Sequence, residues 1–337
     1  MRSPTSRRVR NLGPNRRRRG LTRRGVLLGG AAVGGAAVSG VAVRNLLRAR
    51  SAEARFPPLG DFETVDGVRI HLYDRGAADR TAVVLLHGAS GNLRDFGFGF
   101  SERLLKRYRV IAVDRPGHGH SERGPGEAHR PDRQAALVRE AVARRGVERA
   151  IVLGHSLGCS IALAWALDAP ESVIGAVDLS GTAMPWPGGV SSQYRFADMP
   201  FMGRVAAHTV SALATEAYVH DLIAGIFAPQ TPPEGYLAQV GSPLAARPDN
   251  LRWNGQDVRN LKPFLAKMSE RYPHMKPPLE ILHGADDKIV PAQVHAEPLS
   301  ELVPGARLTL LPGVGHMPHH ADADPIVQAI DRLADAG

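Results

Sequence analysis

Short apolar runs alternate with amphipathic stretches along the chain from residue 56 onward. The apolar runs are rich in β-branched residues, which is typical of strands buried on both faces of a parallel sheet. Between them, stretches such as Pro131 to Arg145 repeat apolar residues with a helical period. This alternation predicts an α/β fold, a mostly parallel, doubly wound sheet with helices on both faces. The predicted strands are 62–65, 68–73, 81–86, 108–113, 149–153, 173–179, 279–282 and 307–311.

Two segments depart from this rhythm. Asp66-Gly67 separates the first two predicted strands and indicates a β-hairpin. Between Gly181 and Pro278 the alternation stops, and proline and glycine clusters separate short helical patches, such as Val205 to Ile226. We therefore predict a core made of residues 56–181 and 278–337, with residues 182–277 inserted late in the sheet as a cap or lid over a pocket. The apolar and aromatic residues of this insertion either line that pocket or pack the cap onto the core.

Charge is distributed very unevenly along the chain. The net charge is +9, but residues 1–55 contain 14 arginines and a single acidic residue, Glu53. The remaining residues contain 28 basic and 32 acidic side chains, so the folded part is slightly acidic. This distribution argues against a nucleic-acid-binding domain, although the arginine-rich tail could contact polyanions without specificity. The single cysteine, Cys159, excludes an internal disulfide framework.

The N-terminus has the features of a targeting segment. Thr22-Arg23-Arg24-Gly25-Val26-Leu27-Leu28 resembles the twin-arginine export motif, and residues 25–43 follow without any charged side chain. That run is long enough to span a bilayer, although glycine and alanine make it only weakly hydrophobic. Ala52-Glu53-Ala54 offers a cleavage site. We expect an exported, periplasmic or extracellular protein, or one anchored to a membrane by residues 25–43. Whether the segment is cleaved or retained stays open, as does a misassigned start codon.

The most informative pattern is Gly-x-Ser-x-Gly at residues 154–158. It joins the predicted strand 149–153 to a stretch with helix-forming composition, residues 160–167. Strand, tight turn and helix form the context of a nucleophile elbow, which holds the serine hydroxyl above the carboxyl end of a sheet. Glycines two residues before and after Ser156 leave room for the neighbouring strand and helix. Ser156 is therefore the candidate nucleophile.

From about Phe62 to its end, the chain resembles the α/β-hydrolase superfamily, in its serine-nucleophile branch. The motifs that carry the resemblance are His87-Gly88, Asp114 to Ser121, the elbow, Gly284 to Pro291 and Gly315 to Pro318, in the family's order. The resemblance implies a triad in the order serine, acid, histidine. His316, in a loop after the last strand, matches the family's base. Asp287, three residues after Gly284, has the spacing of the acid, with Asp286 and Asp178 as alternatives.

The resemblance also implies an oxyanion hole built from backbone N–H groups. The expected donors are Leu157, directly after the nucleophile, and Ala89, in the loop after His87-Gly88. We expect His87 and His155 to have structural roles. No phosphate-binding glycine loop is evident, and no acidic or thiol cluster accompanies His316, His319 and His320 in the sequence, so we expect neither a cofactor nor a metal.

The expected activity is cleavage of a carboxylic ester, or a related acyl bond, in a small-molecule substrate through an acyl-enzyme. The serine at position 156 disfavours dehalogenase and epoxide hydrolase chemistry, because relatives with those activities carry aspartate there. Carbon–carbon bond hydrolysis and cofactor-free perhydrolysis remain as alternatives on the same triad. A catalytically silent binding protein is the alternative from another class. The sequence does not indicate an oligomeric state.

Overall fold

A computed structural model describes residues 40–97, 99–190, 194, 196–197 and 199–337. The twin-arginine-like motif, and the apolar run up to residue 39, lie outside the described residues. The chain divides into two compact units, residues 1–43 and 44–337. The second unit begins with a helical segment over residues 44–55 and contains all of the sheet.

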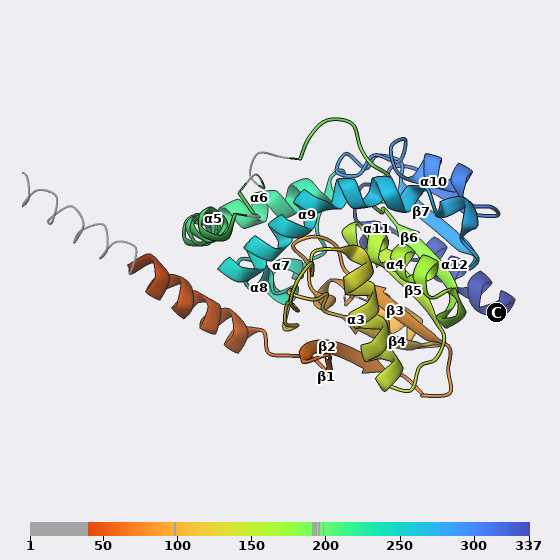
Figure 1. Ribbon diagram of the computed structural model, residues 1–337, viewed down its shortest axis with the longest axis horizontal. Helices are drawn as coiled ribbons and strands as arrows, with labels where there is room; N and C mark the ends of the chain where they lie inside the picture. The colour runs from red at the N-terminus through yellow and green to blue at the C-terminus, as the bar shows by residue number, and fades with distance from the viewer. Residues whose placement is uncertain (1–39, 98, 191–193, 195, 198) are drawn as a thin grey trace, which may run out of the picture. The chain divides into compact units, whose positions relative to one another are not determined.

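Eight strands form one sheet, in the order β1-β2-β4-β3-β5-β6-β7-β8 (Figure 1). β1 and β2 form the predicted hairpin, and its turn residues Asp66 and Gly67 both have positive φ, 49° and 78°. β2 pairs antiparallel with β4, and all other neighbouring strands are parallel. The mostly parallel α/β sheet predicted from the sequence is therefore confirmed. The strands are β1 (Asp61–Val65), β2 (Val68–Arg75), β3 (Ala82–Leu86), β4 (Arg109–Val113), β5 (Ala150–His155), β6 (Val173–Leu179), β7 (Leu279–Gly284) and β8 (Arg307–Leu311).

Apolar cores lie on both faces of the sheet. Successive residues of β3 point to opposite sides, so Val84 belongs to one buried cluster and Val83 to the other. Helices α3 (Pro131–Arg144) and α4 (Leu157–Asp168) contribute to the first cluster, and α2 (Phe100–Leu104) and α12 (Asp324–Ala336) to the second. Burial on both faces explains why these strands are continuously apolar in the sequence.

Five helices follow β6 before the chain returns to the sheet at β7. The longest of them, α9, packs along α5 and also contacts α4 of the core. These helices are α5 (Pro200–Leu213), α6 (Glu216–Phe227), α7 (Tyr236–Gln239), α8 (Ser242–Ala245) and α9 (Pro248–Ser269). The remaining elements are η1 (Leu93–Phe96), η2 (Pro170–Ser172), η4 (Tyr272–His274), α10 (Ala296–Leu302) and α11 (Pro318–Ala321).

The helical patch predicted at 205–226 is divided in two, and the segment after β3 likewise forms two short helices, η1 and α2. η1 and α2 are separate because Gly99 adopts a left-handed conformation with φ 88°, which ends any right-handed helix. α5 and α6 are separate because Ala214 and Thr215 are extended, and the Thr215 side chain accepts a hydrogen bond from the N–H of Tyr218 as the cap of α6. Within the described ranges, no single helix is both long and apolar enough to cross a bilayer. The pair α5 and α6 passes that test only when combined across a bend of 101°.

Candidate active site

Ser156 lies on a strained turn between β5 and α4. Its backbone angles are φ 54° and ψ −121°, outside the regions that residues with side chains normally occupy. The flanking glycines permit this turn. A Cβ at Gly154 would lie 2.4 Å from the backbone of Gly158, and one at Gly158 would lie 2.1 Å from the carbonyl oxygen of Leu86. The strand, turn and helix therefore fix the position of the Ser156 side chain before any substrate arrives.

The structure brings together Ser156, His316 and Asp287, which come from three separate loops at the carboxyl edge of the sheet. The Ser156 hydroxyl lies 3.0 Å from Nε2 of His316, and Nδ1 of His316 lies 2.7 Å from a carboxylate oxygen of Asp287. Because a carboxylate can only accept, Nδ1–H donates to Asp287 and Nε2 carries the lone pair that faces the hydroxyl. This arrangement allows His316 to take a proton from Ser156.

Asp287 is held in its ionised form. Burial raises the pKa of its carboxyl, but hydrogen bonds from His283 and His316 outweigh this effect and hold the pKa well below its ordinary value. The other carboxylate oxygen accepts the backbone N–H groups of Ile289 and Val290, at 2.8 and 2.9 Å. Four donors therefore orient this carboxylate and keep its charge beside His316.

The two alternative acids lie in different environments. Asp286 is exposed to solvent. Asp178 is buried at the end of β6, where one of its oxygens accepts the N–H of Gly181 at 2.9 Å and the other has no hydrogen-bond partner among the described residues. Burial raises the pKa of Asp178 to about 6. Neither carboxylate makes the short contact with His316 that Asp287 makes.

The predicted oxyanion-hole residues flank the nucleophile. Leu157 is the first residue of α4, so its N–H has no partner carbonyl within the helix. The loop that carries Ala89 passes directly over Ser156, since a Cβ on Gly88 would lie 3.0 Å from the Ser156 Cβ. Next to Ala89, the N–H of Ser90 donates to the Asn254 side chain of α9 at 2.7 Å. The first turn of α4 and the loop after β3 therefore both lie beside the Ser156 side chain.

His87 and Arg115 hold that loop from below. Nδ1–H of His87 donates to the Gly88 carbonyl at 2.9 Å, and its Nε2 accepts the N–H of Arg115 at 3.0 Å. Burial lowers the pKa of His87 to about 4, so the ring is neutral near pH 7. The fully buried guanidinium of Arg115 donates to the carbonyl oxygens of His87 and Gly88. These contacts give His87 a structural part in the loop.

Arg115 also connects the core to the cap. Its guanidinium lies 3.0 Å from the carboxylate of Asp257 on α9, and both side chains are at most 1% exposed. Arg123 contacts the other oxygen of the same carboxylate at 2.6 Å. The sequence analysis did not identify this ion cluster. The only available signal was the arginine inside the Asp114 to Ser121 motif, because its partner lies 142 residues further along the chain.

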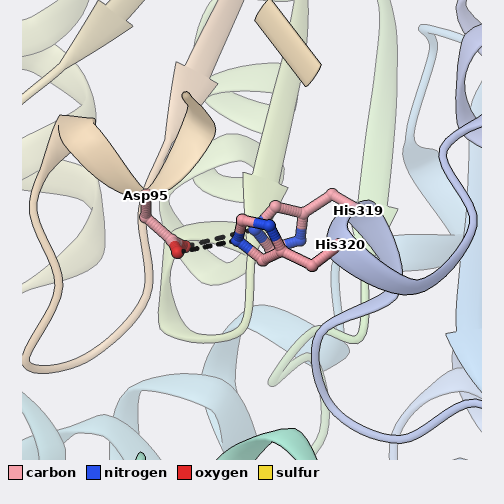
Figure 2. Close-up of side chains that lie close together, drawn as sticks. All are labelled: Asp95, His319 and His320. Atoms are coloured by element: carbon pink, nitrogen blue, oxygen red, sulfur yellow. Dashed lines mark hydrogen bonds and ion pairs between the residues drawn. The ribbon is translucent and has the colours of Figure 1, made fainter. Parts of the chain in front are cut away.

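Asp95, His319 and His320 form a second buried cluster (Figure 2). Asp95 of η1 accepts Nε2–H of His319 at 3.2 Å and of His320 at 3.1 Å, and it accepts the Tyr236 hydroxyl of α7 at 2.6 Å. Nδ1 of His155 lies 4.0 Å from the same carboxylate, and its Nε2–H donates to the His316 carbonyl at 2.8 Å. The cluster therefore links the loop that carries His316, the elbow, η1 and the cap.

The donor set of this cluster changes one part of the sequence analysis. We expected no metal because no acidic or thiol cluster with a matching motif accompanies His316, His319 and His320 in the sequence, but the fold supplies Asp95 from a distant loop. One carboxylate oxygen and two imidazole nitrogens now lie within 4.8 Å of one another, which is a donor set that divalent transition metals accept. The hydrogen bonds to Asp95 hold the same side chains together without an ion.

Comparisons with known proteins agree with this geometry. The model of the α/β-hydrolase fold family matches residues 81–323. An uncharacterized protein of Mycobacterium tuberculosis is 29% identical over 315 residues, covering 87% of this chain and 85% of its own. A 2-hydroxy-6-oxo-6-phenylhexa-2,4-dienoate hydrolase of Burkholderia cepacia is 26% identical over 281 residues, covering 82% and 94%.

A solved structure is similar over most of the chain. The esterase RhEst1 from Rhodococcus sp. ECU1013 superposes with a TM-score of 0.63 at 25% identity, over 83% of this chain and 99% of the esterase. The family match, the sheet order and the elbow thus lead to one assignment. The chain belongs to the α/β-hydrolase family.

Proposed function

We propose that the protein is a serine hydrolase that cleaves a carboxylic ester, or a related acyl bond, through an acyl-enzyme. The observation that carries the proposal is the continuous hydrogen-bonded chain from the Ser156 hydroxyl through His316 to Asp287, with distances of 3.0 and 2.7 Å. A hydroxyl is a weak nucleophile until a base removes its proton, and an imidazole needs a third group to fix its tautomer. A protein that only binds its ligand requires none of these contacts.

In the proposed mechanism, Ser156 Oγ attacks the ester carbonyl while His316 Nε2 takes the hydroxyl proton. Asp287 stabilises the imidazolium, and the N–H groups of Leu157 and Ala89 stabilise the oxyanion of the tetrahedral intermediate. The intermediate collapses, the C–O bond breaks, and His316 returns the proton to the leaving alcohol. Water then attacks the acyl-enzyme with His316 again acting as base, which releases the acid and restores Ser156.

We favour a small or medium, largely apolar ester as the substrate. The similarity to the Rhodococcus esterase supports ester hydrolysis, whereas the similarity to the dienoate hydrolase of Burkholderia cepacia supports carbon–carbon bond cleavage as the second candidate. Perhydrolysis uses the same serine, with hydrogen peroxide in place of water. An ester panel, a dienoate substrate and a peroxide arm, all run on the same preparation, separate these reactions.

The decisive experiment is labelling with a fluorophosphonate probe together with turnover of a graded ester panel. We expect the wild-type protein to be labelled and active. Ser156→Ala should lose both properties, with activity falling by orders of magnitude because the triad acts as a unit. Ser300→Ala, on α10, is the matched control and should behave like the wild type. Labelling and turnover that persist in Ser156→Ala would refute the proposed nucleophile.

We also propose that residues 1–43 direct the protein to the membrane or across it, and that the segment is retained. Retention is favoured by the packing of the residues that cleavage after Ala54 would remove. Asn45 Nδ2 donates to the carbonyl oxygen of His208 at 2.9 Å, and Ala52 is buried with Phe56 and Leu244. Replacing Arg23 and Arg24 with lysine should trap the protein in the cytoplasm if the twin-arginine route operates. An unchanged distribution in fractionated cells would rule out that route.

A further inference from the structure

Helix α5 of the cap buries small residues and exposes its large apolar side chains. This is the reverse of what is usual for a helix that packs only against its own protein. The residues of α5 that are buried are Gly203, Ala207 and Ser211. These small residues, four positions apart, lie on one helical face. A Cβ on Gly203 would lie 2.7 Å from the carbonyl oxygen of Phe196, so this face is in close contact with the rest of the cap.

The large apolar residues of α5 and of the neighbouring α6 face outward. Phe201 is 75% exposed and Leu213 is 71% exposed. Among the described residues of α6, only Phe227 is buried. We call this surface the outer cap face; its large exposed members are Met199, Phe201, Met202, Val205, Val210, Leu213, Tyr218 and Leu222. Scattered exposed apolar residues are normal, but eight large ones on or next to two consecutive helices indicate a contact with an apolar partner, with the exposed carboxylates of Glu216 and Asp221 at its edge on α6.

The helical segment 44–55 extends this surface and adds positive charge to it. The Arg48 guanidinium donates to the carbonyl oxygens of Ser211 and Ala214, at 2.9 and 3.0 Å, so the segment is fastened to the C-terminal end of α5. Leu46 and Leu47 of the segment are 51% and 60% exposed. Its four arginines are also exposed and are accompanied by a single acidic residue. Apolar and basic side chains therefore occupy adjoining parts of one surface.

We infer that the outer cap face lies in the surface of an anionic lipid bilayer, with the arginines of residues 44–55 at the lipid headgroups. The combination of an apolar face with adjoining arginines matches the interfacial mode of membrane binding. α5 has 14 residues and is therefore about 21 Å long, which is shorter than the hydrocarbon core of about 30 Å. Its inner face is also occupied by protein contacts, so it lies along the bilayer surface and does not cross it.

Charge favours lipid over a second copy of the chain as the partner. Residues 44–55, which are fastened to the end of α5, contain four arginines and one acidic residue. Two copies joined through the outer cap face in a symmetric dimer would bring two such basic segments together, which costs free energy. Anionic headgroups neutralise them instead. This inference does not depend on the proposed chemistry of Ser156.

The single native cysteine makes a direct test possible. Cys159 is fully buried, so a cysteine introduced at the surface is the only accessible thiol of the full-length protein. We would attach an environment-sensitive fluorophore to Phe201→Cys and Leu213→Cys, with Glu301→Cys on α10 as the control. Each protein is mixed with vesicles of phosphatidylcholine alone, or of phosphatidylcholine with phosphatidylglycerol.

The expected result is a blue shift and a rise in emission at positions 201 and 213, but not at 301, only when phosphatidylglycerol is present. Binding of the protein to vesicles without any change at 201 and 213 would assign attachment to residues 1–43 alone and overturn the inference. A blue shift that appears without vesicles and grows with protein concentration would identify self-association and would also overturn it. Circular dichroism serves as the folding check for each labelled protein.

Discussion

Helices α4 and α5 are both apolar, but the large apolar side chains are buried in α4 and exposed in α5. Every residue of α4 from Leu157 to Ala166 is buried between the sheet and its neighbours. α5 buries three small residues and presents its large apolar side chains outward. Hydrophobic content alone therefore does not determine whether a helix contributes to the core. The two helices differ in where their small residues lie. In α5 the small residues occupy the face that contacts the protein, so the large side chains lie on the remaining surface of the helix.

The residues of the proposed triad belong to the core, whereas α5 belongs to the cap. The largest predicted effect concerns the triad. Asp287→Asn should lower kcat on one ester by about 10⁴, because an amide leaves His316 in the wrong tautomer. Asp286→Asn is the matched control, since the neighbouring carboxylate is exposed, and it should retain nearly full activity. Circular dichroism verifies the fold of both variants. A large loss in Asp286→Asn instead would move the acid to the other carboxylate.

The second-largest predicted effect concerns the buried ion pair between Arg115 of the core and Asp257 of the cap. Asp257→Asn removes the counter-ion of the fully buried Arg115 and should lower the free energy of unfolding by about 3–5 kcal/mol. Chemical denaturation measures this change. Glu140→Gln breaks an exposed ion pair with Arg144 and serves as the control, with an expected change below about 0.5 kcal/mol. Equal effects in the two variants would mean that Arg115 finds another partner.

A buried carboxylate beneath the elbow predicts an unusual pH dependence of stability. The folded-state pKa of Asp178, about 6, lies above the ordinary value of 3.8, because burial favours the neutral form. Its contribution is therefore fully present below pH 3.8 and is lost as the pH rises through about 6. Asp178→Asn should remove this loss and stabilise the protein at pH 8 by about 3 kcal/mol, since one pKa unit corresponds to about 1.4 kcal/mol. Denaturation at pH 5 and pH 8 measures the difference in the free energy of unfolding between Asp178→Asn and the wild type. An equal difference at both pH values would contradict the raised pKa of Asp178.

The smallest effect returns to the two helices directly. Leu213→Ala, on α5, should change the free energy of unfolding in lipid-free buffer by less than about 0.5 kcal/mol, because its side chain is already exposed. The same substitution at the fully buried Leu163 of α4 should cost about 2–5 kcal/mol. Thermal denaturation of both variants compares them. A substantial destabilisation by Leu213→Ala would indicate that α5 has a partner within the protein.

Local patterns were sufficient to predict the strands, the hairpin and the Gly-x-Ser-x-Gly turn, because each depends on neighbouring residues. Spacing from Gly284 also indicated Asp287, whose carboxylate lies beside His316 in the structure. The ion cluster of Arg115 with Asp257, and the contacts of Asp95 with His319, join residues more than a hundred positions apart. Neither hydrophobic periodicity nor a turn motif indicates such pairs. The exposure of the large apolar side chains of α5 was not predictable from the sequence either, because it depends on which segments of the protein cover the helix.

The buried ion pair of Arg115 and Asp257 has a consequence for how substrate gains entry. Both side chains are at most 1% exposed, so displacing α9 from the core would separate two charges inside the protein. It would also weaken the contacts by which Arg115 holds the carbonyl oxygens of His87 and Gly88, next to Ser156. Any widening of the approach to Ser156 is therefore expected in the cap segments that precede α9, and not in α9 itself.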